Sequence, residues 1–499
     1  MFEKVLIANR GEIAVRILRA CREEGLRSVA VFSEADRRAP HAILADQAVE
    51  IGPAAAAESY LDIDRLLAAA QATGAEALHP GYGFLAESAE LARRVEEAGL
   101  VFIGPPADAI DAMGDKTRAR ARMAAAGIPV VPGSEPVGSA EAAAEAATDV
   151  GYPVLLKAAA GGGGKGMRSA ADEAELRTGF ERATREAKSA FGDGRVYLER
   201  HLARPRHVEI QVLADEDRAL HLGERECSIQ RRHQKLIEEA PSPAIDGALR
   251  ARMGEVAVRA AEAVSYRGAG TVEFLLDGED FYFLEMNTRI QVEHPVTELV
   301  TGVDLVREQL AIAAGRPALS GAPAPPPRGH AIECRISAED PRSGFLPSTG
   351  EIVGFEAPAG PGIRWDGGIR TGLEVGLHYD PLLGKLIVHA SSREGAIRRM
   401  RAALEGLRVD GVETTIPFHL AVLDEPDFRR GELSIRYVEE HPELLAAKPR
   451  ELGEAAMAIA VLCADRGHDG AEAVRSTGSG PGATGRVTLT PWRRALGGW

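Results

Sequence analysis

Short apolar runs alternate with amphipathic helical patterns in the N-terminal part of the chain. KVLIANR, SVAVFSEAD and AEALHPG are typical of buried strands, whereas GEIAVRILRACREEG, DIDRLLAAAQATG and AELARRVEEAG are typical of covering helices. This alternation predicts a parallel sheet with helices on its faces. The first strand-to-helix turn carries only Gly11 rather than G-x-G-x-x-G, which argues against a dinucleotide site.

The chain is too long for one hydrophobic core. Its 499 residues exceed the size at which single cores stop growing, so we expect several domains. After about residue 114 the helices and strands are mixed, and a Pro-rich connection, SGAPAPPPRG, precedes antiparallel strand patterns such as HAIECRISAED and GKLIVHAS. We therefore predict an α/β and α+β protein with a Rossmann-like parallel-sheet domain, an α+β domain, an antiparallel-sheet domain and a helical, flexible tail, at residues 1–113, 114–328, 329–445 and 446–499.

Composition narrows the classes of function. The net charge of −15 argues against a general nucleic-acid-binding surface. The four cysteines are far apart and form no C-x-x-C pair, so neither a disulfide framework nor a zinc site is expected. The chain opens on a strand pattern without a signal-like leader and has no run of 18 apolar residues, which predicts no membrane span and a cytoplasmic, reducing location.

A glycine-rich segment, KAAAGGGGKGM at residues 157–167, follows the strand pattern PVLLK. Successive glycines let backbone N–H groups close around an anion, and Lys157 and Lys165 would neutralise phosphate. Lys165 is followed by glycine rather than serine or threonine, so this is not a Walker-type loop. A flexible surface loop is the simpler alternative, but the flanking lysines favour phosphate contact.

A hairpin pattern places two acidic residues opposite each other. TVEFLLD and FYFLEMN flank GED, and a three-residue loop would set Glu273 across from Glu285. Two carboxylates across a ladder repel each other unless a cation lies between them. A hard divalent ion resolves this repulsion, and Asn287 adds an amide oxygen on the same face. The alternative is a solvated face with two exposed glutamates, which the aromatic neighbours make less favourable.

The segment EMNTRIQVEHP continues directly from this hairpin. If the strand runs on through it, side chains alternate between two faces, and one face carries Glu285, Asn287, Arg289, Gln291 and Glu293. A sheet face beside a core should be apolar, so this polar row predicts a functional surface.

Two further segments carry weaker signals. ECSIQRRHQKLIEEAP, residues 226–241, gathers basic residues that suit either an anion site or a solvated turn, and its residues alone favour the turn. HPGYGFLAES, residues 79–88, places a loop at the end of a strand, where α/β folds bind ligands, but a tight turn fits equally well.

Together these segments resemble biotin carboxylases, the ATP-grasp enzymes of acyl-CoA and pyruvate carboxylases. Between Met1 and about Leu445, eight strings occur in the family's order: ANRGEIAVRILRA, HPGYGFLAES, MGDKTRAR, KAAAGGGGKGM, ERHLARPRHVEIQV, CSIQRRHQK, EMNTRIQVEHPVTE and GHAIECRISAEDP. The resemblance implies that residues 114–328 form an ATP-grasp domain with a mobile lid. It also implies that the domains on either side are the N- and C-terminal biotin carboxylase domains.

The resemblance implies a role for each matching residue. The ATP site would comprise Lys116, Lys157, Gly163, Gly164, Glu199, Arg200, His201, Leu202, His207, Gln230 and His233, so the basic turn is reassigned to a binding site. The Mg²⁺ or Mn²⁺ ligands would be Glu273, Glu285 and Asn287, in agreement with the hairpin argument. Bicarbonate would contact Lys235, Arg289, Gln291 and Val292, and biotin would contact Arg335 and Tyr82. The expected catalytic residues are Lys235, Arg289, Arg335, which stabilises the biotin enolate, and Glu293, which deprotonates bicarbonate.

The implied activity is ATP-dependent carboxylation of biotin by bicarbonate, through carboxyphosphate, as the first half-reaction of an acetyl-CoA or propionyl-CoA type carboxylase. The biotin-attachment motif Ala/Val-Met-Lys-Met is absent. Biotin is therefore expected on a separate biotin carboxyl carrier protein, with carboxyltransferase proteins as further partners. The family also suggests a homodimer. The ending TPWRRALGGW is interpreted as weakly ordered or as a docking segment.

Two other functions compete with this one. The first is another ATP-grasp ligase that activates a different carboxylate, and RIQVEHP together with Arg335 argues against it. The second is a catalytically silent, nucleotide-binding regulatory subunit. The joint presence of Glu285, Arg289, Glu293 and Arg335 argues against that role.

Overall fold

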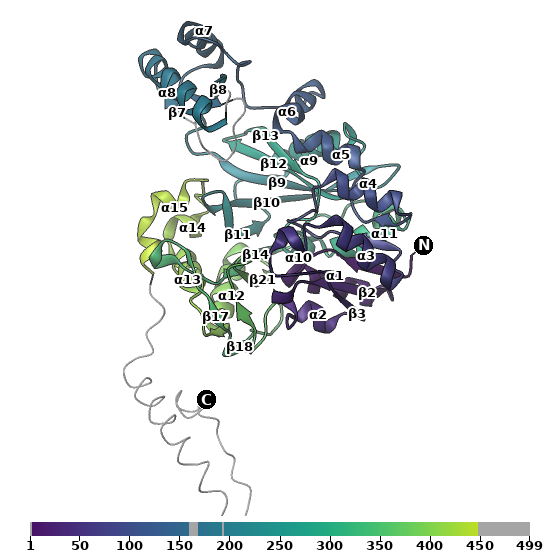
Figure 1. Ribbon diagram of the computed structural model, residues 1–499. Coiled ribbons are helices and arrows are strands. Elements are labelled where there is room, and N and C mark those ends of the chain that lie inside the picture. The colour runs from purple at the N-terminus through teal and green to yellow at the C-terminus, as the bar shows by residue number, and fades with distance from the viewer. Residues whose placement is uncertain (1, 159–167, 192–193, 448–499) are drawn as a thin grey trace, which may run out of the picture.

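The computed structural model describes residues 2–158, 168–191 and 194–447. Its N-terminal part is a five-stranded parallel sheet, as predicted (Figure 1). The strand order is β3 (Gln47–Glu50), β2 (Arg27–Phe32), β1 (Lys4–Ile7), β4 (Ala77–His79) and β5 (Val101–Phe102). The helices of this part are α1 (Gly11–Glu23), α2 (Pro40–Leu44), α3 (Ile63–Thr73), α4 (Ala89–Glu97) and α5 (Ala107–Gly114).

The helix boundaries in this part follow local signals in the sequence. The Asp62 side chain accepts a hydrogen bond from the backbone N–H of Arg65 and so caps α3, and Gly74 ends that helix in the left-handed region at φ +63°. Ser88 caps α4 in the same way through the N–H of Leu91. The predicted helices therefore begin and end close to where their caps require.

An eight-stranded antiparallel sheet forms the centre of the molecule (Figure 1). Its strand order is β13 (Asp280–Asn287), β12 (Gly268–Asp277), β9 (Arg206–Ala214), β10 (Ala219–Arg231), β11 (Gln234–Ala240), β14 (His330–Ser337), β21 (Leu382–Ala390) and β19 (Ile363–Gly367). Helix α9 (Gly247–Glu262) packs against β9 and β10 over an apolar core that includes Ile210, Met253 and Phe274. Helices α10 (His294–Thr301) and α11 (Leu305–Ala313) follow β13 along the chain.

The central sheet crosses a predicted domain boundary. Strand β11 precedes residue 328 and β14 follows it, yet the two strands pair through Ile237 and Cys334. The second and third predicted domains therefore share one sheet. The boundaries at residues 113, 328 and 445 stay predictions.

A small lobe projects from the central sheet at the top of Figure 1. It consists of the antiparallel strands β6 (Val154–Ala158), β7 (Arg168–Ala170) and β8 (Val196–Arg200) with helices α7 (Ala140–Val150) and α8 (Glu173–Phe191). Helix α6 (Lys116–Ala125) precedes this lobe in the chain and contacts β13. The glycine-rich positions Gly163, Gly164 and Lys165 lie outside the described residues.

The C-terminal part packs helix α12 (Arg393–Gly406) against β14 and β21. The short helices are α13 (Ile416–Asp424), α14 (Pro426–Arg430) and α15 (Tyr437–Glu440), and the short strands are β15 (Glu339–Asp340), β16 (Leu346–Pro347), β17 (Gly350–Glu351), β18 (Gly354–Glu356), β20 (Glu374–Val375) and β22 (Arg408–Asp410). The parallel, mixed and antiparallel parts confirm the predicted α/β and α+β class. The predicted tail lies outside the described residues from position 448 on.

Two local predictions about the hairpin are wrong. The β12–β13 turn has two residues rather than three, because Asp277 pairs directly with Asp280. In addition, β13 ends at Asn287, so the strand does not continue through residue 293. The backbone N–H of Thr288 donates to Oε1 of Glu87 in the N-terminal part instead of extending the ladder. This contact turns the chain away from β12 and toward α10.

In the part of the chain that the structure describes, no helix is both long and apolar enough to cross a membrane.

Candidate functional site

One face of the central sheet carries a cluster of charged side chains around Lys235 on β11. The Nζ atom lies 2.9 Å from Oε1 of Glu273 on β12 and 2.7 Å from Oε1 of Glu293 before α10, and it also contacts Glu209 on β9. All three carboxylates are buried. Burial favours the neutral form of Lys235, but the carboxylates outweigh it and raise its pKa well above the usual value.

Irregularities in two strands set which face these side chains occupy. In the β10–β11 ladder, Ile229 pairs with Ile237 and Gln230 pairs with Lys235, so Leu236 is an extra residue. This bulge places Lys235 on the same face as Glu238 despite their odd spacing. A second bulge at Leu284 restores the predicted pairing of Glu273 with Glu285, although the turn is shorter than predicted.

The sequence predicted neither Glu209 nor Arg225, and the structure places both in the site. Arg225 on β10 is fully buried, and its Nε donates to Oε1 of Glu209 at 2.5 Å. Its other nitrogens donate to Gln211, Thr271, Thr297 and Gln291. The sequence signal was present, because His207, Glu209 and Gln211 recur every second residue between buried Val208, Ile210 and Val212.

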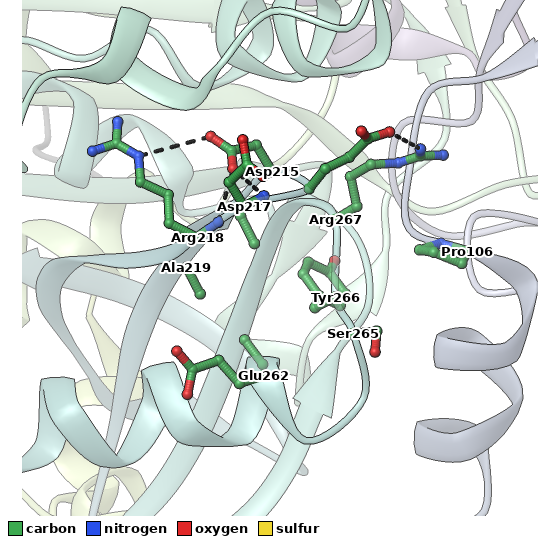
Figure 2. A pocket seen from close by; sticks show the side chains of 12 residues that line it. Pro106, Asp215, Asp217, Arg218, Ala219, Glu262, Ser265, Tyr266 and Arg267 are labelled. Atoms are coloured by element: carbon green, nitrogen blue, oxygen red, sulfur yellow. Dashed lines mark hydrogen bonds and ion pairs between the residues drawn. The ribbon is translucent and has the colours of Figure 1, made fainter.

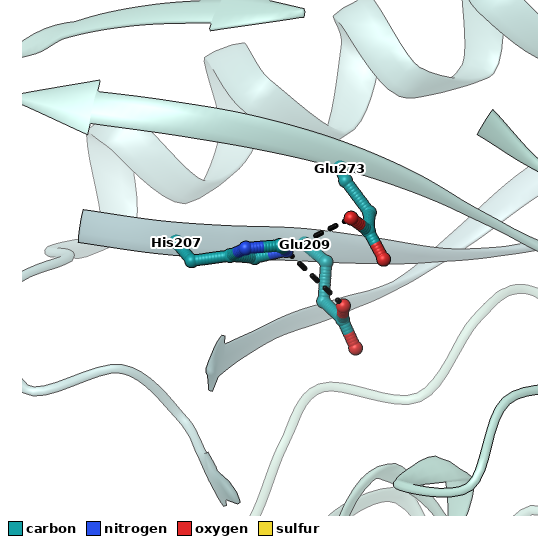
Figure 3. A group of neighbouring side chains, drawn as sticks. All are labelled: His207, Glu209 and Glu273. Carbon is teal, nitrogen blue, oxygen red and sulfur yellow. Dashed lines mark ion pairs between the residues drawn. The ribbon is translucent and has the colours of Figure 1, made fainter. Parts of the chain in front are cut away.

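His207 joins this cluster from β9. Figure 3 shows its ring facing two carboxylates, with Nε2 3.0 Å from Oε2 of Glu273 and 3.8 Å from Oε2 of Glu209. Burial alone would raise the pKa of Glu273, but Lys235 and His207 hold that pKa well below the usual value. Glu273 is therefore an ionised carboxylate in a buried position.

The predicted metal ligands fit a hard divalent cation. Glu273 and Glu285 are direct ladder partners, and Asn287 donates from Nδ2 to Oε1 of Glu273 at 2.9 Å. Cationic side chains balance these carboxylates, since Lys116 Nζ lies 2.5 Å from Oε2 of Glu285. Carboxylate and amide oxygens of this kind are the donors that Mg²⁺ and Mn²⁺ take in proteins.

The predicted bicarbonate residues converge on the site although they do not lie on a strand. Gln291 Nε2 donates to Oε1 of Glu273 at 2.7 Å, and the carbonyl oxygen of Val292 accepts from Nζ of Lys385 at 2.5 Å. Arg289 points to Oδ1 of Asn287 at 2.8 Å and to Glu87 at 3.1 Å. Glu87 lies in the quoted segment HPGYGFLAES but was not predicted as a site residue.

Glu293 links the cluster to Arg335 on β14. Its Oε1 contacts Lys235, and its Oε2 accepts from Nη2 of Arg335 at 2.8 Å. Burial alone would raise the pKa of Glu293, but Lys235, Arg335 and Arg225 depress it strongly. Glu293 is therefore ionised at neutral pH, as a base must be.

The residues predicted for ATP lie in two groups. Lys157 on β6 and Arg120 on α6 both contact the carboxylate of Glu199 on β8. Lys116, one turn before Arg120, contacts Glu285, so α6 connects the small lobe to the edge of the central sheet. Arg200 ends β8 and donates to the backbone oxygen of Val150 at 3.4 Å, and His201 and Leu202 follow it at half-buried positions.

The basic turn between β10 and β11 contributes unevenly. Gln230 is buried and pairs with Lys235, beside the cluster. His233 is exposed at the tip of the turn with φ +66°. The structure thus brings Gln230 to the cluster but leaves the predicted role of His233 as a prediction.

Tyr82 reaches the site from the N-terminal part. Asn9 donates from Nδ2 to the backbone oxygens of Pro80 and Tyr82, each at 2.7 Å, and so fixes the loop after β4. The Tyr82 hydroxyl contacts Glu12, whose carboxylate lies 3.3 Å from Nζ of Lys385. Lys385 is the ladder partner of Arg335, so the loop is connected to the predicted biotin end of the site.

A cavity of about 380 Å³ lies elsewhere on the molecule, at the β9–β10 turn (Figure 2). Its lining includes Asp215, Arg218, Tyr266 and Arg267, and none of the predicted site residues. The charged cluster, rather than this cavity, is the candidate active site.

Comparisons with known proteins agree with this geometry. The biotin carboxylase N-terminal domain matches residues 1–110, the carbamoyl-phosphate synthase L chain ATP-binding domain matches residues 115–320, and the biotin carboxylase C-terminal domain matches residues 333–440. One of the two subunits of a pyruvate carboxylase from Methanothermobacter thermautotrophicus is 53% identical over 91% of this chain and 92% of its own. A biotin carboxylase from Haemophilus influenzae is 52% identical over 88% of this chain and 99% of its own.

Solved structures lead to the same family. The biotin carboxylase domain of a thermophilic 2-oxoglutarate carboxylase bound to bicarbonate has a TM-score of 0.85 and 47% identity, and it covers 89% of this chain and 99% of its own. The biotin carboxylase subunit of a pyruvate carboxylase has a TM-score of 0.82 and 49% identity over 90% of this chain and all of its own. The chain therefore belongs to the biotin carboxylase family of ATP-dependent ligases.

Proposed function

We propose that this chain carboxylates biotin on a separate carrier protein, with ATP and bicarbonate as co-substrates. The observation that carries the proposal is the position of Glu293 between Lys235 and Arg335, at 2.7 Å and 2.8 Å. An ionised base thus lies between the residues proposed for bicarbonate and for biotin. A related domain from Hydrogenobacter thermophilus was solved with MgADP and bicarbonate, which supports these substrates.

In the first step, Lys235, Arg289 and Gln291 hold bicarbonate beside Glu293. Glu293 takes the O–H proton, the bicarbonate oxygen bonds to the γ-phosphorus, and the bond from that phosphorus to ADP breaks. Lys116 and Lys157 offset negative charge on the phosphates. Mg²⁺ held by Glu273, Glu285 and Asn287 would supply further neutralisation of that charge.

In the second step, carboxyphosphate releases CO₂ and phosphate. The phosphate takes the ureido N–H proton of biotin, and the resulting nitrogen attacks CO₂. Arg335 donates to the enolate oxygen that forms, which is stabilisation of charge that develops during the reaction. Burial of Glu293, Gln291 and Glu273 supports a site that keeps water from the reactive intermediate.

The partners follow from this chemistry. A carrier protein brings biotin to Arg335, and a carboxyltransferase passes the carboxyl group on and selects its acceptor. We also propose a homodimer, since the Hydrogenobacter relative was solved as a domain dimer. Cys21, Cys227 and Cys334 are free thiols, which supports the proposed cytoplasmic location.

A direct test measures ADP release with ATP, Mg²⁺ and bicarbonate, with and without free biotin. We expect turnover that requires bicarbonate and rises with biotin. Turnover that ignores biotin but requires another carboxylate would identify a different ATP-grasp ligase. ATP binding without any turnover would identify a silent regulatory protein.

A further inference from the structure

Two buried glutamates lie side by side behind Arg335. Glu238 on β11 and Glu333 on β14 are direct partners in the antiparallel ladder, so their side chains share one face of the sheet. Both residues are fully buried, at 0% exposure. Like-charged groups in this arrangement repel each other, and burial removes the water that would screen them.

The pair has few hydrogen-bond donors of its own. Oε1 of Glu238 accepts from Nε of Arg335 at 2.5 Å. The other three oxygens, Oε2 of Glu238 and both oxygens of Glu333, are buried and accept no hydrogen bond from any described residue. A buried ionised carboxylate without donors is costly, so a proton on the pair explains the missing donors.

Charged and titratable groups surround the pair on several elements. The cations are Arg335, Lys385 and Lys235, and the remaining groups are Glu293, Tyr82 and the neighbouring thiol of Cys334. Lys385 is engaged elsewhere, by the oxygen of Val292 at 2.5 Å and by Glu12 at 3.3 Å. Lys235 is held by its own three carboxylates. Arg335 is thus the cation in direct contact with the pair.

We propose that Glu238 and Glu333 form a proton-sharing carboxyl pair that positions Arg335 for biotin, in which Glu333 keeps the proton and ionised Glu238 holds the guanidinium. This proposal rests on the proposed function, because Arg335 acts on biotin there. Nε of Arg335 stays anchored to Glu238 while Nη2 leaves Glu293 for the enolate oxygen. The two carboxylates therefore divide the guanidinium between an anchor and an exchangeable contact.

The pKa shifts agree with this division. Burial raises the pKa of Glu333 well above its usual value, with Lys385 as the main opposing influence. Burial also raises the pKa of Glu238 to about 7, with Arg335 as the main opposing influence. Glu238 therefore gains its charge as pH rises through about 7, while Glu333 stays neutral.

The test compares Glu238→Gln and Glu333→Gln with the control Glu308→Gln, whose carboxyl lies on α11. Infrared difference spectra of the full chain should contain a protonated carboxyl band at neutral pH that Glu333→Gln removes and Glu308→Gln keeps. In biotin-dependent ADP release, Glu238→Gln should raise the biotin KM by roughly tenfold or more, since it removes a charge-assisted hydrogen bond. It should also flatten the rise in that rate through pH 7, whereas Glu333→Gln should keep both properties.

Two results would overturn the proposal: absence of the protonated band from the wild-type spectrum, or a Glu238→Gln variant with wild-type biotin KM and pH profile. Biotin-independent ATP cleavage by Glu238→Gln should stay near wild type, which separates lost positioning from lost folding. If the wild-type chain shows no biotin-stimulated turnover at all, the proposed function fails. The infrared result still decides whether the pair holds a proton.

Discussion

Nη2 of Arg335 lies 2.8 Å from Oε2 of Glu293, so the residue proposed to bind biotin contacts the residue proposed to take the bicarbonate proton. Lys235 holds the other oxygen of the same carboxylate at 2.7 Å. Glu293 is thus the shared contact of the two proposed half-reactions. A proton or a substrate that displaces one cation changes the charge felt by the other.

Replacement of Glu293 with Gln should reduce bicarbonate-dependent ATP turnover by roughly 10²- to 10⁴-fold, because the amide cannot accept the proton. ATP binding, measured by calorimetry, should stay near wild type. The matched control is Glu308→Gln, which lies on α11 outside the site. A Glu293→Gln enzyme with near-normal turnover would remove Glu293 from the role of base.

Replacement of Glu285 with Gln should lower Mg²⁺-dependent ATP turnover on the order of 100-fold or more, because the metal loses a carboxylate ligand. Higher Mg²⁺ concentrations should restore part of the rate. Glu279→Gln, in the exposed turn of the same hairpin, serves as control. Equal activities of the two variants across the Mg²⁺ titration would contradict the proposed metal position.

Replacement of Arg225 with Lys should destabilise the fold by about 3–5 kcal/mol, because an ammonium cannot replace the planar fork that satisfies several buried acceptors. Denaturant unfolding of both proteins measures the difference. Arg252→Lys, at an exposed site on α9, should change stability little. A small effect at Arg225 would mean that water or neighbouring groups replace its contacts.

Glu239 should contribute stability that depends on pH. Burial alone would raise its pKa, but His330 and Arg393, at 2.6 Å and 2.7 Å, lower that pKa from 4.5 to about 2. Because the folded-state pKa is depressed, the contribution is present above about pH 4.5 and is lost as pH falls toward about 2.

Glu239→Gln should therefore destabilise the protein at pH 7 by about 3 kcal/mol, and the difference should shrink in acid. Unfolding temperatures of both proteins from pH 7 down to about pH 3 give the comparison. A difference that grows as pH falls would assign the wrong sign to this interaction.

The period-two pattern of polar residues was enough to predict much of the site. Glu273 does pair with Glu285, and Gln291 and Glu293 do reach the same cluster. The reason for part of this success was wrong, since β13 ends at Asn287 and a bend carries the chain onward. The polar character of these residues was informative even where the assumed strand was absent.

Strand irregularities and cross-strand partners could not be predicted in the same way. The bulges at Leu236 and Leu284 depend on pairing between strands, and neither carries a glycine or proline signal. Arg225 looked like one charged residue among many, because its acceptors come from four other segments. Long-range pairing, rather than local propensity, therefore decided these positions.

The pairing of β11 with β14 has a practical consequence for cleavage of the chain. A cut in the Pro-rich connection would sever the backbone between the two strands but leave their ladder intact, with Ile237 still opposite Cys334. The two fragments would each carry half of the contacts to Arg335, since Glu238 and Glu293 precede the cut and Arg335 follows it. Fragment complementation, in which neither piece alone is competent, is the behaviour that this shared sheet dictates.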